Sequence, residues 1–223
     1  MIPMPNVGPT TEPYLQRVAR RLVSSPLFWV VFLLFAGGWQ IVRSILATVP
    51  PALPTLGVVP EFTLTNQYGQ DFGSQELAGQ VWIANFIFTR CPTVCPAFTQ
   101  TMFDIQHKAR PLSGALRLVS FSVDPEHDTP KVLLEYARAN KASRYMWAFL
   151  TGHYEAIRTT VVDGLKVAMG RDGPEEDFMS IFHGNYMVLV DQQGQIRGYY
   201  DAGEAGVVDR VLRGAGLLIN RGH

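Results

Sequence analysis

The sequence predicts an α/β sandwich with a mixed central sheet, preceded by one transmembrane helix. Residues 22–42 form an apolar run of about twenty residues without a charge, which is enough to cross a bilayer as a helix. Beyond residue 60, strand-like and helix-like segments alternate, and this order favours parallel strands in the middle of a sheet. A late hairpin that turns at Gly194 adds antiparallel strands, so we expect a mixed sheet.

The charge balance argues against one class of partner. Among 223 residues, nineteen Lys and Arg side chains balance nineteen Asp and Glu side chains. A nucleic-acid-binding domain usually carries a basic excess on one face. We therefore expect no nucleic-acid partner.

The N-terminal apolar run predicts a membrane anchor with a defined orientation. Arg17, Arg20 and Arg21 precede it, and positive charges stay on the cytoplasmic side. A cleaved signal peptide would have a shorter apolar core and a small-residue cleavage site, and a buried core helix would have a polar face. We expect a cytoplasmic segment at 1–21, a transmembrane anchor at 22–42, a proline-rich linker at 43–60 and an exported domain at 61–223.

The exported domain is expected to contain short strands separated by helices. The run 81–88 is almost continuously apolar, as is typical of a strand buried on both faces. Asp128 and Thr129 precede Pro130, and a polar cap followed by proline predicts the start of a helix. The predicted strands are 62–64, 81–88, 116–123, 147–150, 186–191 and 196–200. The predicted helices are 96–110, 130–141, 153–162 and 207–217.

The stretch FTRCPTVCP, at 88–96, contains both cysteines of the chain, Cys91 and Cys95. It follows a predicted strand and opens a predicted helix, a place where α/β sheets favour ligand chemistry. A structural disulfide would close a very small loop and would gain little chain entropy. A sulfur beside a helix N-terminus is expected to have a lowered pKa, and thiolate is the form needed for redox attack and for metal binding.

The spacing of the two cysteines favours a metal over a disulfide without excluding the disulfide. Positions i and i+4 of a helix place Cβ atoms about 5–6 Å apart, whereas a disulfide needs about 3.8 Å. A third ligand would come from a histidine, and a structural or surface role is the alternative for each one. The candidates are His107, His127, His153, His183 and His223. Two thiolates and an imidazole form a soft set that copper accepts, while a closed zinc site needs a fourth ligand.

Three motifs together resemble the SCO/SenC family of copper proteins. They are FTRCPTVCP, the segment SVDPEHDTP at 122–130, and a single histidine, His183, just before the strand NYMVLVD. The resemblance implies a thioredoxin-like three-layer sandwich in which Cys91, Cys95 and His183 bind one copper ion, Cu(I) or Cu(II). Asp124 matches a family position beside the ligands, with a turn-capping role as the alternative, and His127 is a further candidate near the site.

The resemblance also implies a function. It predicts a single-pass protein of the inner membrane whose periplasmic domain helps to assemble the CuA centre of cytochrome c oxidase. Expected partners are oxidase subunit II, a thiol–disulfide reductant and other copper chaperones. The alternatives are a thiol–disulfide oxidoreductase that keeps the CuA-site cysteines reduced, and a redox or copper sensor. A peroxiredoxin-like peroxidase is disfavoured, because neither cysteine follows the pattern Pro-x-x-x-Thr-x-x-Cys.

Overall fold

The computed structural model describes residue 16 and residues 23–46, 52–92, 95–112, 114–173 and 181–221. The chain divides into two compact units, Met1–Pro51 and Ala52–His223. Apart from residue 16, the predicted cytoplasmic segment 1–21 lies outside the described residues.

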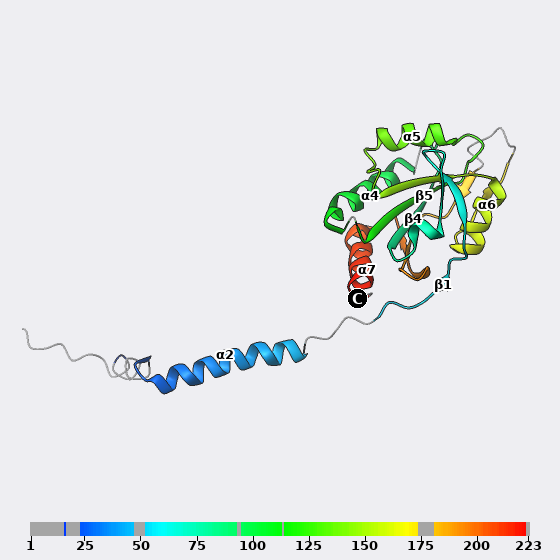
Figure 1. The fold of residues 1–223 in the computed structure, drawn as a ribbon. Helices are drawn as coiled ribbons and strands as arrows, with labels where there is room; N and C mark the ends of the chain where they lie inside the picture. The colour runs from blue at the N-terminus through cyan, green and yellow to red at the C-terminus, as the bar shows by residue number, and fades with distance from the viewer. Residues whose placement is uncertain are drawn as a thin grey trace, which may run out of the picture. The chain divides into compact units, whose positions relative to one another are not determined.

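The described part of the first unit consists mainly of helix α2, Pro26–Leu46 (Figure 1). Its large apolar side chains are exposed, with Leu27 at 70% and Phe35 at 76% of full exposure. Among the described residues, no helix is long and apolar enough to cross a membrane. The transmembrane anchor predicted at 22–42 is therefore not confirmed, and it stays a prediction.

In the second unit, the described strands form one sheet of eight and a separate pair. The large sheet has the order β1-β10-β9-β4-β5-β6-β2-β3, and the pair is β7-β8. The strand bounds are β1 Gly57–Val58, β2 Thr63–Asn66, β3 Asp71–Gly73, β4 Val81–Ile87, β5 Leu116–Ser122, β6 Trp147–Thr151, β7 Met169–Arg171, β8 Ile181–His183, β9 Tyr186–Val190 and β10 Gln195–Asp201.

The pairing confirms the predicted mixed sheet. The three central strands β4, β5 and β6 run parallel, with Val81 opposite Leu116 and Leu118 opposite Trp147. Strands β9 and β10 join the β4 side in antiparallel orientation, and β2 and β3 extend the β6 side in the same way. Parallel central strands bring their C-terminal ends to one edge of the sheet. There, residues 88–92 follow β4, and we call this segment the cysteine loop.

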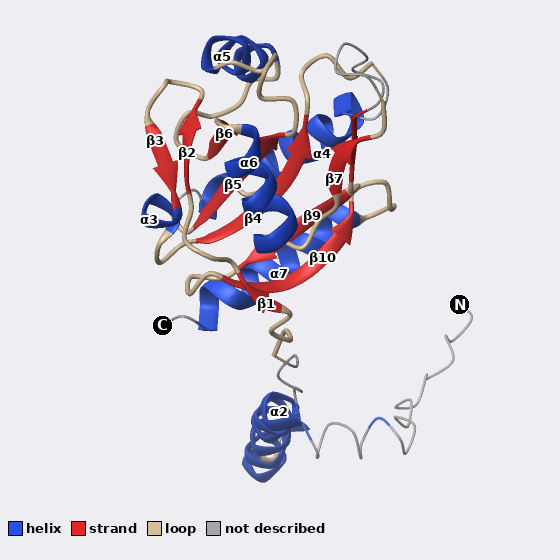
Figure 2. Ribbon diagram, turned by 90° about the vertical axis from the view of Figure 1, so that its right-hand side faces the viewer, coloured by secondary structure: helices blue, strands red, loops and turns tan. Residues whose placement is uncertain are grey.

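Helices cover both faces of this sheet, which gives three layers. Their bounds are α3 Ser74–Leu77, α4 Cys95–Lys108, η1 Arg110–Leu112, α5 Pro130–Ala139, α6 Tyr154–Arg158, the π-helical segment η2 Thr159–Gly164, and α7 Val207–Arg221. Figure 1 shows α4 and α7 on one side of β4 and β5 and α6 on the other, and in Figure 2 α6 lies in front of the sheet.

Strand β4 contributes to the core on both faces, as its sequence predicts. All seven of its residues are buried. Ile83 and Ile87 pack with Met102 of α4, whereas Ala84 and Phe86 pack with the layer that contains α6 and β7–β8. The alternation follows the two-residue period of a strand.

The structure differs from the sequence prediction in several local features. Part of the predicted linker pairs with the sheet, since Gly57 lies opposite Ile196. The helix predicted at 153–162 is instead the short α6 continued by η2. Helix α5 is capped by Thr129, whose side chain accepts a hydrogen bond from the backbone N–H of Val132. The hairpin β7–β8 has no counterpart among the predicted strands.

Candidate metal centre

The two cysteines lie between the end of β4 and the first residue of α4. The Cys91 backbone N–H donates to the Phe88 carbonyl at 3.2 Å, which turns the chain directly after the strand. Helix α4 begins at Cys95, so the second sulfur lies at its N-terminal end. Both cysteines are buried, they form no disulfide, and their side chains are hydrogen-bonded to each other.

His183 is brought to this loop by the short hairpin β7–β8. Its Nε2 atom lies 3.8 Å from the Sγ atom of Cys95. The Nδ1 atom lies 3.2 Å from the Gly184 carbonyl, which can only accept, so Nδ1 carries the proton of a neutral ring. This tautomer leaves the Nε2 lone pair facing the thiol. The Phe88 ring packs edge-on against the imidazole, with 6.1 Å between ring centroids.

The pairing of the hairpin identifies which side chains share the face of His183. Met169 lies opposite His183, and Arg171 lies opposite Ile181. Because side chains alternate along a strand, these four share one face, and Gly170 and Phe182 occupy the other. Met169 and Ile181 pack in the same cluster as both cysteines. The histidine face of the hairpin therefore lies against the cysteine loop.

Burial dominates the protonation of the candidate ligands. It lowers the pKa of His183 below 6.5, which keeps the imidazole neutral and available to a metal. Burial raises the pKa of the Cys95 thiol from 9.0 to about 12, and a hydrogen bond from the Phe88 backbone opposes that effect only in part. The expectation of a lowered pKa is wrong for this sulfur, because burial removes the hydration that a thiolate needs, and its neighbours Cys91 and Asp128 also favour the neutral thiol.

The described residues do not form a closed metal site. Across the described ranges, which omit 93–94 and 174–180, no three His, Cys, Asp or Glu side chains are grouped closely enough to hold a metal ion. Cys95 approaches both Cys91 and His183, so it is the centre of the predicted set. The three predicted ligands are thus neighbours that would have to draw closer around an ion.

Asp124, predicted to lie beside the ligands, is buried just beyond β5 and forms ion pairs. Its carboxylate lies 2.7 Å from Nε of Arg90 and 3.6 Å from Nη2 of Arg171. Only the backbone of Asp124 acts in the turn, where its carbonyl accepts from the N–H groups of His127 and Asp128. The side chain therefore binds arginines from the cysteine loop and from the hairpin.

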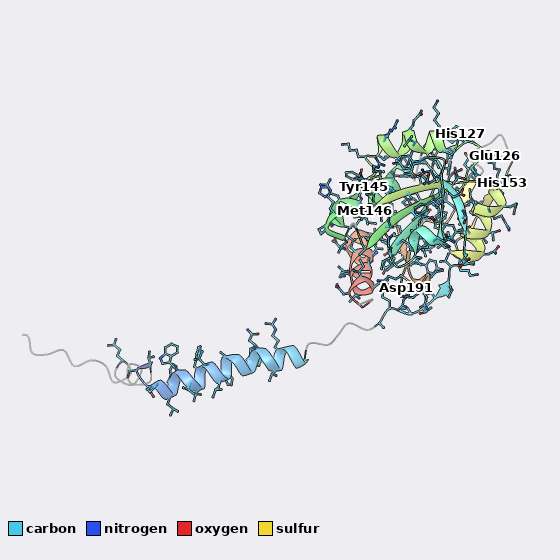
Figure 3. The ribbon with its side chains drawn as sticks, in the orientation of Figure 1. Glu126, His127, Tyr145, Met146, His153 and Asp191 are labelled. Carbon is cyan, nitrogen blue, oxygen red and sulfur yellow. The ribbon has the colours of Figure 1, made fainter. Side chains whose placement is uncertain are left out.

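The structure does not bring His127 against the described ligands. Its side chain is exposed, and Figure 3 shows it beside Glu126 at the end of the domain that carries α5. His107 is exposed on α4, and His153 is exposed at the start of α6. His223 lies outside the described residues.

The sequence did not predict the roles of three side chains near the site. Arg90 and Arg171 are ordinary charged residues in the sequence, and only the fold identifies Asp124 as their partner. Asp128, predicted as a helix cap, is instead fully buried and accepts hydrogen bonds from Thr89 and Ser122. The sequence contained only an indirect indication of this role. Thr129 can cap the helix by itself, so the carboxylate of Asp128 is not needed as a cap.

Comparison with known proteins identifies the fold. A SCO1/SenC family lipoprotein from Bacillus anthracis has a structure with a TM-score of 0.69 and 31% identity, covering 75% of this chain and 99% of the other. BsSco is a member of the Sco family of cytochrome c oxidase assembly proteins in which a disulfide switch has been identified. Its structure has a TM-score of 0.66 and 32% identity, covering 76% and 98% of the two chains. The predicted thioredoxin-like α/β fold is confirmed.

Sequence relatives agree with the structural neighbours. A SCO1 protein homolog from Bacillus subtilis is 32% identical over 197 residues, which is 88% of this chain and 94% of the relative. The same fold occurs in Arabidopsis thaliana ScoI with copper bound, with a TM-score of 0.61 and 24% identity, covering 74% and 99% of the chains. The SCO1/SenC family matches residues 52–211, nearly all of the second unit. The chain therefore belongs to the SCO1/SenC family.

Proposed function

We propose that this protein is a copper metallochaperone that helps to assemble the CuA centre of cytochrome c oxidase. One copper ion would bind to Cys91, Cys95 and His183. The observation that carries this proposal is the 3.8 Å separation between the Cys95 sulfur and Nε2 of His183, two residues 88 positions apart in the sequence. The Sco family role in oxidase assembly supports the choice of target.

The donor set explains how copper would be held and released. Thiolate sulfur and imidazole nitrogen accept both Cu(I) and Cu(II). Copper displaces the thiol protons as it binds, so the high pKa of Cys95 does not prevent loading. Three protein ligands leave room for an incoming sulfur of oxidase subunit II, and the ion would pass by ligand exchange. Another copper chaperone would supply the ion, and a thiol–disulfide reductant would keep both cysteines reduced.

Membrane attachment through residues 22–42 is a further part of the proposal. It is supported by the absence of charge in this segment and by the exposure of apolar side chains along α2. The anchor would keep the exported domain on the periplasmic side of the inner membrane, near the oxidase. Alkaline carbonate extraction tests it: the full chain should stay in the membrane fraction, and release into the supernatant would exclude the anchor.

Copper titration tests the central proposal. The full-length protein, purified in detergent and reduced, should bind one copper ion and show a thiolate–copper charge-transfer band when loaded with Cu(II). Cys91→Ser and Cys95→Ser should each lose the band and most of the affinity. Undiminished binding in the variant that lacks both sulfurs would refute the proposed site.

A thiol–disulfide reductase is the second candidate function. The two thiols favour it, because they are hydrogen-bonded to each other and form no disulfide. One thiolate of the pair would attack a disulfide of the target, and the second thiol would resolve the mixed disulfide. The target gains two electrons and two protons, and Cys91 and Cys95 end as a disulfide. His183→Ala separates the two functions, because it should abolish copper delivery and leave disulfide reduction in place. A redox or copper sensor would use the same pair.

A further inference from the structure

Asp124 is the one carboxylate among the described residues that pairs with both segments of the candidate metal centre. Its side chain is completely buried, and its Oδ2 atom lies 2.7 Å from Nε of Arg90. A second nitrogen of the same guanidinium lies 3.3 Å from Oδ1, which makes the contact two-pronged. Arg90 directly precedes Cys91, so this pair holds the cysteine loop against the end of β5.

The second partner of Asp124 comes from the hairpin. Nη2 of Arg171 lies 3.6 Å from Oδ1, and this arginine is on the hairpin face that also carries His183. One carboxylate is therefore ion-paired with a residue next to the first thiol and with a residue beside the histidine.

The hairpin needs such a connection. Strands β7 and β8 have three residues each and form a sheet of their own, separate from the eight-stranded sheet. A two-stranded hairpin is only marginally stable by itself. Its pairing carries His183 but does not determine how far the imidazole lies from the cysteines. The described contacts between the hairpin and its surroundings include the apolar packing of Met169 and Ile181 and the edge-on packing of Phe88 against the imidazole. The pair between Asp124 and Arg171 is the ion pair among them.

A purely structural role is the competing explanation. Buried ion pairs often contribute little net stability, because removing the charges from water costs as much as their attraction returns. A buried ion pair with a purely structural role could lie anywhere in the core, whereas the pairs of Asp124 link the cysteine loop to the hairpin. The chain contains a suitable comparison: Asp191 is also buried, with Nη1 of Arg197 at 3.1 Å, but in the turn between β9 and β10.

We infer that Asp124 is a positioning residue, which holds the hairpin and the cysteine loop together through Arg171 and Arg90 and so sets the separation of His183 from the two sulfurs. Only the expected effect of Asp124 on copper binding rests on the proposed function. The link between hairpin and loop is a property of the copper-free protein and is measurable there.

The test compares Asp124→Asn with Asp191→Asn in the full-length protein. Both substitutions keep the size of the side chain and remove a buried charge that faces arginine. Asp124→Asn should speed hydrogen exchange in the hairpin, most clearly at the Gly184 N–H, which bonds to the Ala168 carbonyl at 2.9 Å. It should also weaken copper binding by about ten-fold or more and alter the imidazole signature in the electron paramagnetic resonance of Cu(II). Asp191→Asn should change neither hydrogen exchange in the β7–β8 hairpin nor the Cu(II) spectrum. Figure 3 shows Asp191 at the opposite end of the domain from His127.

Two outcomes of this comparison would overturn the inference. Hairpin exchange that is unchanged in Asp124→Asn would remove the link itself. Equal effects of Asp124→Asn and Asp191→Asn on exchange and copper would assign Asp124 a merely structural role. If Asp124→Asn does not fold, Arg171→Gln tests the same link while keeping the pair between Asp124 and Arg90, and unchanged exchange in that variant would also overturn it. If the wild-type protein binds no copper, the proposed function fails, and the exchange data still decide the role of Asp124.

Discussion

The Asp128 carboxylate accepts hydrogen bonds from both the backbone N–H and the hydroxyl of Thr89, at 3.1 and 2.5 Å. Ser122 donates a further hydrogen bond at 2.7 Å. Thr89 lies two residues before Cys91, and Asp128 lies just before α5, so one buried side chain joins the cysteine loop to β5 and to the next helix. Burial raises the pKa of Asp128, and the donors from Thr89 and Ser122 oppose that rise.

Asp128→Asn should lower the free energy of unfolding by about 1–3 kcal/mol, because the amide keeps one acceptor oxygen for three donors and turns its own donors toward them. Urea unfolding of the reduced protein measures the change. Glu126→Gln is the matched control, since Glu126 is an exposed carboxylate in the same loop, and it should stay within about 0.5 kcal/mol of wild type. Equal losses in the two variants would show that the network around Asp128 adds no stability.

His183→Ala should reduce copper affinity by on the order of 100-fold. This is the upper end of the loss seen when a residue that only supports a metal ligand is replaced, and His183 is a proposed ligand itself. The reason is the loss of the nitrogen that faces Cys95. His127→Ala is the control, and it should leave the affinity within about two-fold, because the His127 side chain is exposed. Competition with a copper chelator of known affinity measures both variants. A comparable loss in His127→Ala would make His127 a contributor to the site.

The elements around the cysteines could be predicted because their signals are local. The apolar run at 81–88 reports a strand buried on both faces, and the structure has β4 at Val81–Ile87. Pro96 in the first turn marks the start of the following helix, and α4 begins one residue earlier. Neither feature depends on distant parts of the chain.

The position of His183 could not be predicted from local pattern. It meets Cys95 across 88 residues, through strands of three residues that are too short to show a period. Only the family resemblance singled it out among the histidines. The prediction of a lowered pKa for the Cys95 thiol was wrong for a related reason. The start of the helix can be recognised in the sequence, but the burial that raises this pKa to about 12 depends on the whole fold.

The high pKa of Cys95 predicts that alkali weakens the reduced, copper-free protein. Above about pH 9 the thiol ionises in the unfolded chain, whereas the folded protein keeps the proton to about pH 12. The unfolded chain then binds fewer protons than the folded one, so stability falls as pH rises through this window, by up to about 1.4 kcal/mol per pH unit. Below pH 9 both states are protonated and the contribution is complete.

Urea unfolding at several pH values between about 8 and 11 measures this effect. Cys95→Ser provides the reference, because groups away from the cysteine pair titrate alike in both proteins. The difference between the two curves reports the Cys95 thiol together with its interaction with Cys91. The wild-type curve should fall more steeply than that of the variant. Parallel curves would mean that Cys95 has an ordinary pKa in the folded protein.

Copper should stabilise the reduced protein and leave the oxidised protein unchanged. An ion bound by Cys91, Cys95 and His183 would join the start of α4 to the end of β8, where the Cys95 and His183 side chains already approach each other. At a free copper concentration of about 100 times Kd, binding to the folded state adds about 2.7 kcal/mol, less whatever affinity the unfolded thiols retain. Thermal unfolding with and without copper measures the gain. The disulfide form has no thiolate to offer, so its midpoint should not move, and an equal shift in the oxidised protein would show that the stabilising copper binds elsewhere.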